Sequence, residues 1–226
     1  MNMNTLYLTG SSGGLGSVTR SYFLDRGWNV VGMDAFDDGF KHMKFLFQNI
    51  DSANESSVEQ AFKTANAKFG APRLLFATIG GLKPWAAHED MSIGDFRFVM
   101  DLNIIATFTC VKQATKLMKP LGTGTIITMG AETALKPDPK KAAYVAAKAA
   151  VIAFTQTIAL ETKEYGVNAN CIVPTVIHTK ANESWGAAED IPKWTKSEDI
   201  AALCLFLASG EGKAVNGAVL RVPNKM

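Results

Sequence analysis

Short apolar runs rich in β-branched residues alternate along this chain with longer amphipathic stretches. This alternation is typical of βαβ units, in which each helix crosses back and the next strand joins the sheet in parallel. The predicted strands are Thr5–Thr9, Asn29–Asp34, Lys44–Asn49, Arg73–Thr78, Gly124–Gly130, Val167–Val173 and Gly217–Val222. The predicted helices are Gly14–Arg26, Glu55–Phe69, Ser92–Lys119 with a break near Asp101, Ala142–Glu164 and Ser197–Ala208. We therefore expect an α/β fold with a doubly wound, seven-stranded parallel sheet and helices on both of its faces.

The chain length and composition favour one domain. Its 226 residues are 47% hydrophobic, which is enough for a substantial core, and no repeat or linker divides the chain into two compositional halves. We expect a single domain over residues 1–226. Pro, Gly, Asn, Ser and Thr accumulate from Thr175 to Lys196, so an irregular loop is expected there, over about residues 175–196.

Charge and cysteine usage argue against several functional classes. The 23 basic and 21 acidic residues form no basic run, so no nucleic-acid partner is expected. The N-terminus does not have the pattern of a signal peptide, and no stretch approaches the length of a membrane span, so no membrane partner is expected. The three cysteines and three histidines are scattered, which predicts no metal site and favours reduced thiols in a cytoplasmic protein.

A glycine-rich turn follows the first predicted strand and opens the first helix, with the sequence Thr9-Gly-Ser-Ser-Gly-Gly-Leu-Gly16. Glycine permits a tight turn and a close approach of the backbone to a pyrophosphate, whose charge is stabilised at the helix N-terminus. Such a turn is weak evidence by itself, but its place between a strand and a helix is typical of dinucleotide binding.

Asp34 ends the second predicted strand, about twenty residues after the turn. A carboxylate at this place accepts hydrogen bonds from adenosine ribose hydroxyls and repels a 2′-phosphate. No Arg or Lys stands beside Asp34 in the sequence or within the turn. The pattern therefore favours NAD(H) over NADP(H), although a solvated residue at a strand end is the alternative interpretation.

Tyr144 and Lys148 are four residues apart on a predicted helix, so their side chains share one face. A nearby cation stabilises a phenolate, and we expect Lys148 to lower the pKa of Tyr144 toward the range useful for acid–base catalysis. An accidental surface pair is the alternative for such a short motif, but here it follows the fifth strand in a chain that also carries the glycine turn.

In this order, the motifs resemble those of the short-chain dehydrogenase/reductase family, over almost the whole chain from Thr5 to about Val222. The resemblance implies a Rossmann-type fold, a small-molecule substrate, a homodimer or homotetramer, and two sets of site residues. The cofactor would be bound by Gly10, Ser12, Gly14, Leu15, Gly16, Asp34, Asp51, Gly80, Lys148, Pro174 and Thr179, and the catalytic residues would be Tyr144, Lys148 and Asn103. In particular, Asp51 would contact adenine, Asn103 would hold a water of a proton relay, and Thr179 would bind the carboxamide.

The departures from the family pattern are informative. The family serine lies thirteen residues before the tyrosine, and that position is Ala131. Thr128, Thr133 or no residue at all supplies the missing hydroxyl, and Glu132 is a weaker candidate because its charge would repel a developing phenolate. Of the family's Asn-Asn-Ala-Gly after the fourth strand, only the glycine survives, at Gly80.

Loss of the serine makes the chain similar to the dihydropteridine reductases, which reduce a quinonoid dihydropterin with NADH. Shared features are Gly80-Gly81 with Trp85 soon after, and the Ile191–Thr195 stretch before the last helix. Asn103, by contrast, is typical of the ketone-reducing members. A different class of hypothesis is an NAD(H)-binding sensor or scaffold that has lost turnover, but such a protein needs neither the phenol of Tyr144 nor a relay.

Overall fold

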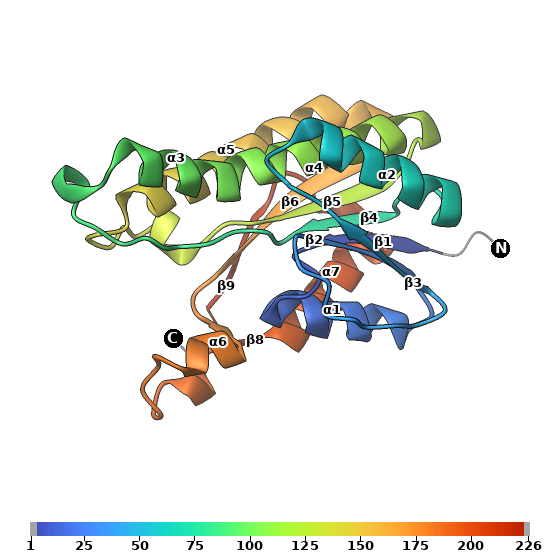
Figure 1. The fold of residues 1–226 in the computed structure, drawn as a ribbon. Coiled ribbons are helices and arrows are strands. Elements are labelled where there is room, and N and C mark those ends of the chain that lie inside the picture. Colours follow the sequence, from blue (N-terminus) through green and yellow to red (C-terminus); the bar gives the residue numbers. More distant parts are fainter. Residues whose placement is uncertain (1–3, 224–226) are drawn as a thin grey trace.

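The computed structural model describes residues 4–223, which are arranged around a parallel seven-stranded sheet with helices on both faces (Figure 1). The strand order is β3-β2-β1-β4-β5-β6-β9. The bounds are β1 (Thr5–Thr9), β2 (Asn29–Asp34), β3 (Phe45–Asn49), β4 (Leu74–Ala77), β5 (Gly124–Met129), β6 (Val167–Pro174) and β9 (Val219–Val222). These strands confirm the seven predicted from the sequence, with ends that differ by at most two residues.

The central strands are buried along their whole length, because helices cover both faces of the sheet. Alternate residues of each strand therefore enter two separate cores. Leu6 and Leu74 point to the core on one face, whereas Tyr7 and Leu75 point to the core on the other.

The helices divide into two layers. Helices α2 (Glu55–Phe69), α4 (Ala106–Met118) and α5 (Ala142–Thr162) cover the face to which Tyr7 points, and α1 (Gly14–Leu24) and α7 (Ser197–Ala208) cover the other (Figure 1). Asn54 begins α2 by accepting a hydrogen bond from the Ser57 N–H at 3.2 Å. This satisfies one of the N–H groups that a helix start leaves without an internal partner.

The long helix predicted from Ser92 is interrupted where the sequence analysis expected a break. Helix α3 (Ile93–Met100) leads into a π-helical turn at Asp101–Ile105, and α4 continues from there. Asn103 lies in this wider turn and is fully buried.

The direction in which strands are added reverses between β1 and β4. From β1 the chain adds β2 and β3 on one side, and later adds β4, β5, β6 and β9 on the other. In open α/β sheets such a reversal leaves a crevice at the carboxyl ends of the strands, where ligands bind. The glycine turn follows β1, and Gly80 follows β4, so both lie at this edge.

The segment over residues 175–196 contains more regular structure than the predicted irregular loop. β7 (Ile177–His178) and β8 (Thr195–Lys196) pair in parallel, and the short helix α6 (Lys180–Glu183) lies between them in sequence (Figure 1). Within this segment Trp194 is buried, and the ring centroids of Trp185 and Trp194 are 5.4 Å apart. The sequence did not predict these elements because each is too short to show a periodic pattern.

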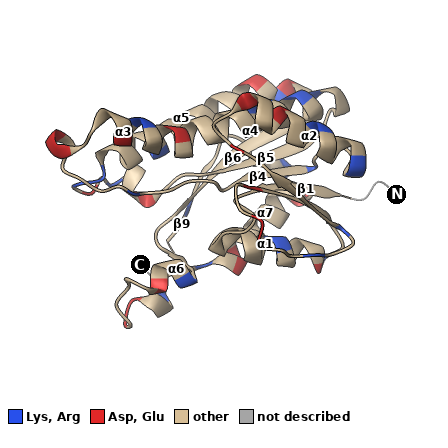
Figure 2. Ribbon diagram, in the orientation of Figure 1, with Lys and Arg blue, Asp and Glu red and all other residues tan. Residues whose placement is uncertain are grey.

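Helix α5 and the turn after it, Ala142–Tyr165, are long and apolar enough by composition to span a membrane. In the structure this helix packs against β5 and β6, so its apolar character also suits a core helix. Acidic and basic residues are interspersed over the other helices (Figure 2). Within residues 4–223, no group of three or more His, Cys, Asp or Glu side chains is placed to hold a metal ion.

Candidate active site

The glycine turn has the close backbone approaches that its sequence predicted. Gly10 adopts φ +66°, and a Cβ atom there would lie 2.7 Å from Thr78 Oγ1. A Cβ atom at Gly16 would overlap the Gly10 carbonyl. Since larger side chains do not fit at either position, the turn holds the start of α1 close to the ends of β1 and β4.

Asp34 is hydrogen-bonded into this turn. Its Oδ2 accepts the Ser12 N–H at 3.0 Å, and its Oδ1 accepts the Phe36 N–H at 3.3 Å. The Ser12 hydroxyl donates to the Phe36 carbonyl at 2.7 Å. The carboxylate is thus fixed beside the glycine turn and remains partly exposed, as a group that binds ribose hydroxyls has to be.

A nearby arginine, which the sequence analysis did not single out, lies on α1 and is neutralised. Arg20 donates to both carboxylate oxygens of Asp38, at 3.0 and 2.8 Å, and its guanidinium stacks over Phe40 at 4.0 Å. These hydrogen bonds hold the pKa of Asp38 below its usual value. Arg20 is 4% exposed, so its guanidinium binds Asp38 and is not free to bind a phosphate.

Asp51, near the start of the loop between β3 and α2, stabilises its own turn. Its Oδ1 accepts the Ala53 N–H at 3.1 Å, and its N–H donates to Ser57 Oγ at 3.0 Å. The side chain is exposed at the same edge of the sheet as Asp34.

Gly80, Asn103 and Lys148 converge at the carboxyl end of β4. A Cβ atom at Gly80 would lie 2.7 Å from Asn103 Oδ1 and 2.9 Å from Lys148 Nζ. The Asn103 amide accepts the Gly81 N–H at 3.2 Å and donates to the Gly81 and Val99 carbonyls at 2.9 and 2.8 Å. The side chain of Asn103 therefore holds the loop after β4 against the π-helical turn.

Lys148 is buried in the same place. Its Nζ donates to the Met129 carbonyl at 2.9 Å and lies 5.8 Å from the centre of the Tyr144 ring. Removal from water penalises the ammonium and lowers its pKa to about 8.

The structure contradicts the expectation that Lys148 lowers the pKa of Tyr144. Burial raises the pKa of this phenol to about 12, because desolvation disfavours the phenolate. The ammonium is directed to the Met129 carbonyl rather than to the phenol oxygen. The phenol of Tyr144 is therefore protonated at neutral pH.

The residues that could supply the missing serine hydroxyl point in different directions. Ala131, which occupies the position of the family serine, is 7% exposed. Thr128 is fully buried, and its hydroxyl pairs with Thr155 Oγ1 at 2.6 Å within the core under α5, so it does not replace the serine. Glu132 is bound by Arg221 on β9 at 3.0 and 2.5 Å and does not replace it either. Thr133 Oγ1 is buried and has no hydrogen-bond partner among the described residues.

The segment after β6 reaches back to the glycine turn. A Cβ atom at Gly14 would lie 2.7 Å from the Cβ and Cγ2 atoms of Thr179. Thr179 Oγ1 also accepts the Asn182 N–H at 3.3 Å and begins α6. Pro174 is buried at the end of β6. His178, on β7, pairs with Glu183 at 2.6 Å.

A mostly apolar pocket of about 480 Å³ lies beside the start of α5. It is formed by the segment around Ala87 and by residues 137–142, and it includes Val145, the neighbour of Tyr144. Trp85, which follows the Gly80-Gly81 pair, is 53% exposed, and its ring lies 5.7 Å from the Lys141 ammonium.

Comparison with known proteins identifies the family. A family model described as "Enoyl-(Acyl carrier protein) reductase" matches residues 10–224. The chain belongs to the short-chain dehydrogenase/reductase family. Momilactone A synthase of Oryza sativa subsp. japonica is 29% identical over 95% of this chain and 86% of its own length. The 3-oxoacyl-[acyl-carrier-protein] reductase of Synechocystis sp. is 32% identical over 77% of this chain and 72% of its own length.

Solved structures confirm the fold. A 3-ketoacyl-(acyl-carrier-protein) reductase from Brucella melitensis complexed with NADH superposes with a TM-score of 0.91, at 21% identity over 99% of this chain and 98% of that one. ElxO with NADP bound gives a TM-score of 0.90, at 22% identity over 98% of both chains. The Rossmann-type α/β fold expected from the sequence is thus correct. The two structures contain different dinucleotides, NADH and NADP, and so do not indicate which one this chain binds.

Proposed function

We propose that this protein is an NAD(H)-dependent oxidoreductase that reduces a carbonyl or conjugated acceptor, with Tyr144 as the proton donor. The observation that carries the proposal is the convergence of Lys148, Asn103 and Gly80 next to Tyr144, at the edge of the sheet where β1 carries the glycine turn. Structural packing alone does not require an ammonium to be buried beside a phenol.

The residues present suit a dinucleotide. Gly10, Ser12, Gly14, Leu15 and Gly16 form a turn whose backbone can approach a pyrophosphate, and the Asp34 carboxylate can accept ribose hydroxyls. NAD(H), when bound, supplies the redox chemistry. Asp51, Gly80, Pro174 and Thr179 border the same edge of the sheet and complete the proposed binding set.

The catalytic roles follow from burial and charge. Lys148 has donors beyond the one used by Met129, and these can hold the nicotinamide ribose. Tyr144 transfers its phenolic proton to the acceptor oxygen or nitrogen as two electrons arrive with the hydride. Its raised pKa keeps the proton on the phenol until that step. Asn103 positions the loop after β4. That Asn103 also holds a water molecule of a proton relay remains a prediction.

NAD(H) is proposed over NADP(H) because of the charges beside β2. A 2′-phosphate on the ribose at Asp34 would face that carboxylate, while Arg20 is bound by Asp38. Measured affinities for NADH and NADPH test this choice, and a tighter NADPH complex would overturn it.

For the substrate, a quinonoid dihydropterin is the proposed candidate. Ala131 provides no second hydroxyl, and a conjugated quinonoid acceptor needs less polarisation than an isolated ketone. The apolar pocket beside Val145 and the exposed Trp85 suit a flat substrate. We propose that residues 175–196 form the substrate loop of a single domain. The competing sensor or scaffold hypothesis predicts cofactor binding without turnover.

We also propose a homodimer or homotetramer in the cytoplasm. Large apolar side chains are exposed on the helices around α4 and α5, including Ile105, Phe108 and Leu160. Such a patch suits a second copy of the chain. Sedimentation of the wild type and of Phe108→Glu tests this, with a shift to monomer expected for the variant.

The decisive experiment follows NADH oxidation with a panel of ketones and quinonoid dihydropterin. We expect turnover with at least one acceptor and a loss of about a hundredfold or more in Tyr144→Phe, with NADH binding retained. Binding without turnover on any acceptor would favour the sensor hypothesis. An unimpaired phenylalanine variant would refute the role of Tyr144.

A further inference from the structure

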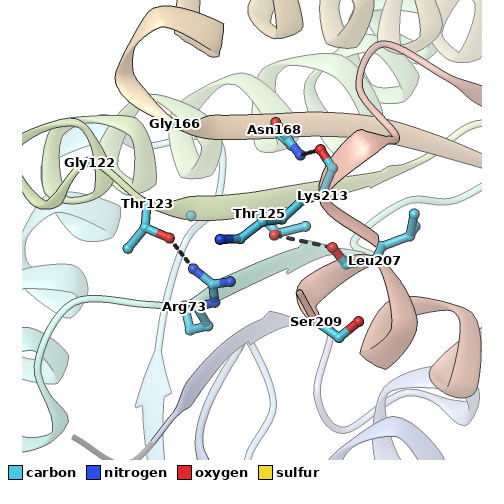
Figure 3. A pocket seen from close by; sticks show the side chains of 10 residues that line it. Arg73, Gly122, Thr123, Thr125, Gly166, Asn168, Leu207, Ser209 and Lys213 are labelled. Atoms are coloured by element: carbon cyan, nitrogen blue, oxygen red, sulfur yellow. Dashed lines mark hydrogen bonds between the residues drawn. The ribbon is translucent and has the colours of Figure 1, made fainter. Parts of the chain in front are cut away.

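A second cavity lies at the opposite edge of the sheet, where β4, β5 and β6 begin. It has a volume of about 190 Å³ and is bordered by Arg73, Thr123, Thr125, Ser209 and Lys213, among others (Figure 3). Tyr144 and the glycine turn lie beyond the other ends of the strands, so this cavity is separate from the proposed active site.

The cavity gathers positive charge without a matching carboxylate. Arg73 precedes β4 and is partly buried, and Lys213 extends from the turn after α7 toward the same space (Figure 3). No acidic residue is among those that border the cavity. Within residues 4–223, neither cation takes part in an ion pair. Two cations that share a cavity repel each other, and an anion between them would relieve that repulsion.

The hydrogen-bonding groups also suit an anion. The Arg73 guanidinium donates to Thr123 Oγ1, which leaves the Thr123 hydroxyl proton and the other guanidinium N–H groups to donate elsewhere. Thr125 and Ser209 already donate to the carbonyls of Leu207 and Phe206. Besides the Asn168 amide, which donates to the Lys213 carbonyl, the remaining side-chain donors around this small space are those of Arg73, Thr123 and Lys213.

We propose that this cavity is a binding site for a phosphate group, distinct from the dinucleotide site. A phosphate offers several acceptor oxygens and two negative charges, which match two cations and a hydroxyl donor. The volume suits inorganic phosphate or the phosphate end of a small monoester and is too small for a whole dinucleotide. The alternative is that Lys213 only offsets the carbonyl groups at the end of α7.

Isothermal titration at constant ionic strength tests the site, with inorganic phosphate and glycerol 3-phosphate as probes and NADH present in excess. We expect saturable binding of at least one probe and a weakening of about tenfold or more in both Arg73→Gln and Lys213→Gln. Lys63→Gln, an exposed position on α2 that does not border the cavity, is the matched control and should bind as the wild type does.

The two probes distinguish the source of the phosphate. Tighter binding of the free ion assigns the site to inorganic phosphate, and tighter binding of the ester assigns it to a phosphorylated metabolite. Absence of binding by both probes, or equal binding by the wild type, Arg73→Gln and Lys213→Gln, would overturn the proposal. Because Lys213 is exposed, its variant remains informative even if Arg73→Gln fails to fold.

Discussion

Lys148 donates a hydrogen bond from Nζ to the Met129 carbonyl at 2.9 Å, and this bond fixes a buried ammonium at the carboxyl end of the sheet. Removal of this ammonium from water lowers the free energy of unfolding, and the same desolvation lowers the pKa of Lys148 from 10.5 to about 8. Functional sites often retain such groups at the expense of stability.

We therefore predict that Lys148→Met stabilises the protein without ligand while abolishing turnover. The expected gain at pH 7 is on the order of 2–3 kcal/mol. Because the folded pKa lies below the unfolded one, the unfolded chain binds more protons between pH 8 and pH 10.5. Wild-type stability should therefore rise relative to the variant across that window, and the difference should vanish above it. Urea unfolding at several pH values measures this, and a variant less stable at pH 7 would contradict it.

Gly80→Ala should disturb the catalytic residues directly. The new methyl group would lie 2.7 Å from Asn103 Oδ1 and 2.9 Å from Lys148 Nζ, so both side chains have to shift. We expect turnover to fall about tenfold or more, with a loss of roughly 1–3 kcal/mol in stability. Gly94→Ala on α3 is the matched control, since only Ser92 Oγ lies near its Cβ position, at 3.6 Å, and it should gain up to about 1 kcal/mol. Equal effects of the two substitutions would refute this account.

Asp34→Ala should change the preference for the dinucleotide. The substitution removes the acceptor for the Ser12 N–H and for the ribose hydroxyls, and it also removes the charge that opposes a 2′-phosphate. We expect NADH affinity to fall about tenfold and the discrimination against NADPH to narrow. Asp37→Asn, on the exposed segment after β2, is the control and should keep the preference of the wild type. Fluorescence titration with both cofactors measures the ratio.

The fold could be predicted because its signals are local and repeated. Each central strand is a short run of mostly apolar or β-branched residues, and glycines mark the turn that follows β1. The burial of Thr128 could also have been inferred, since Ile127 beside it on β5 points into the core on the opposite face. Alternation along that strand would have directed Thr128 toward α5 and away from the position of Ala131.

Contacts between distant parts of the chain could not be predicted in the same way. The pairs Arg20–Asp38 and Glu132–Arg221 depend on side-chain directions that only the folded chain defines. The raised pKa of Tyr144 also depends on its degree of burial, whereas the spacing to Lys148 indicated only that the two share a helix face. The contact of Thr179 with Gly14 joins segments more than 160 residues apart.

Thr133→Val tests whether this residue supplies the hydroxyl that Ala131 lacks. Its Oγ1 is buried without a partner among residues 4–223, a costly state that a bound substrate would relieve. We expect reduction of isolated ketones to fall by about tenfold or more and reduction of quinonoid dihydropterin to change by less than about threefold, with little change in NADH affinity. Thr128→Val removes the bond to Thr155 and should lower stability rather than turnover on folded protein. Equal reduction of ketones by Thr133→Val and the wild type would exclude Thr133 from the site.

Ala131→Ser restores the family hydroxyl and therefore reports on the substrate. Ala131 has an extended backbone, with φ −155° and ψ 147°, and a serine adopts this conformation without strain. If the acceptor is a conjugated quinonoid, it gains little from a second donor, and we expect its turnover to change less than about threefold, while reduction of isolated ketones rises about tenfold or more. Steady-state rates on quinonoid dihydropterin and on a simple ketone, each compared with the wild type, decide the matter. A large gain on the pterin and none on the ketone would contradict the argument that loss of the serine selected an acceptor needing little polarisation.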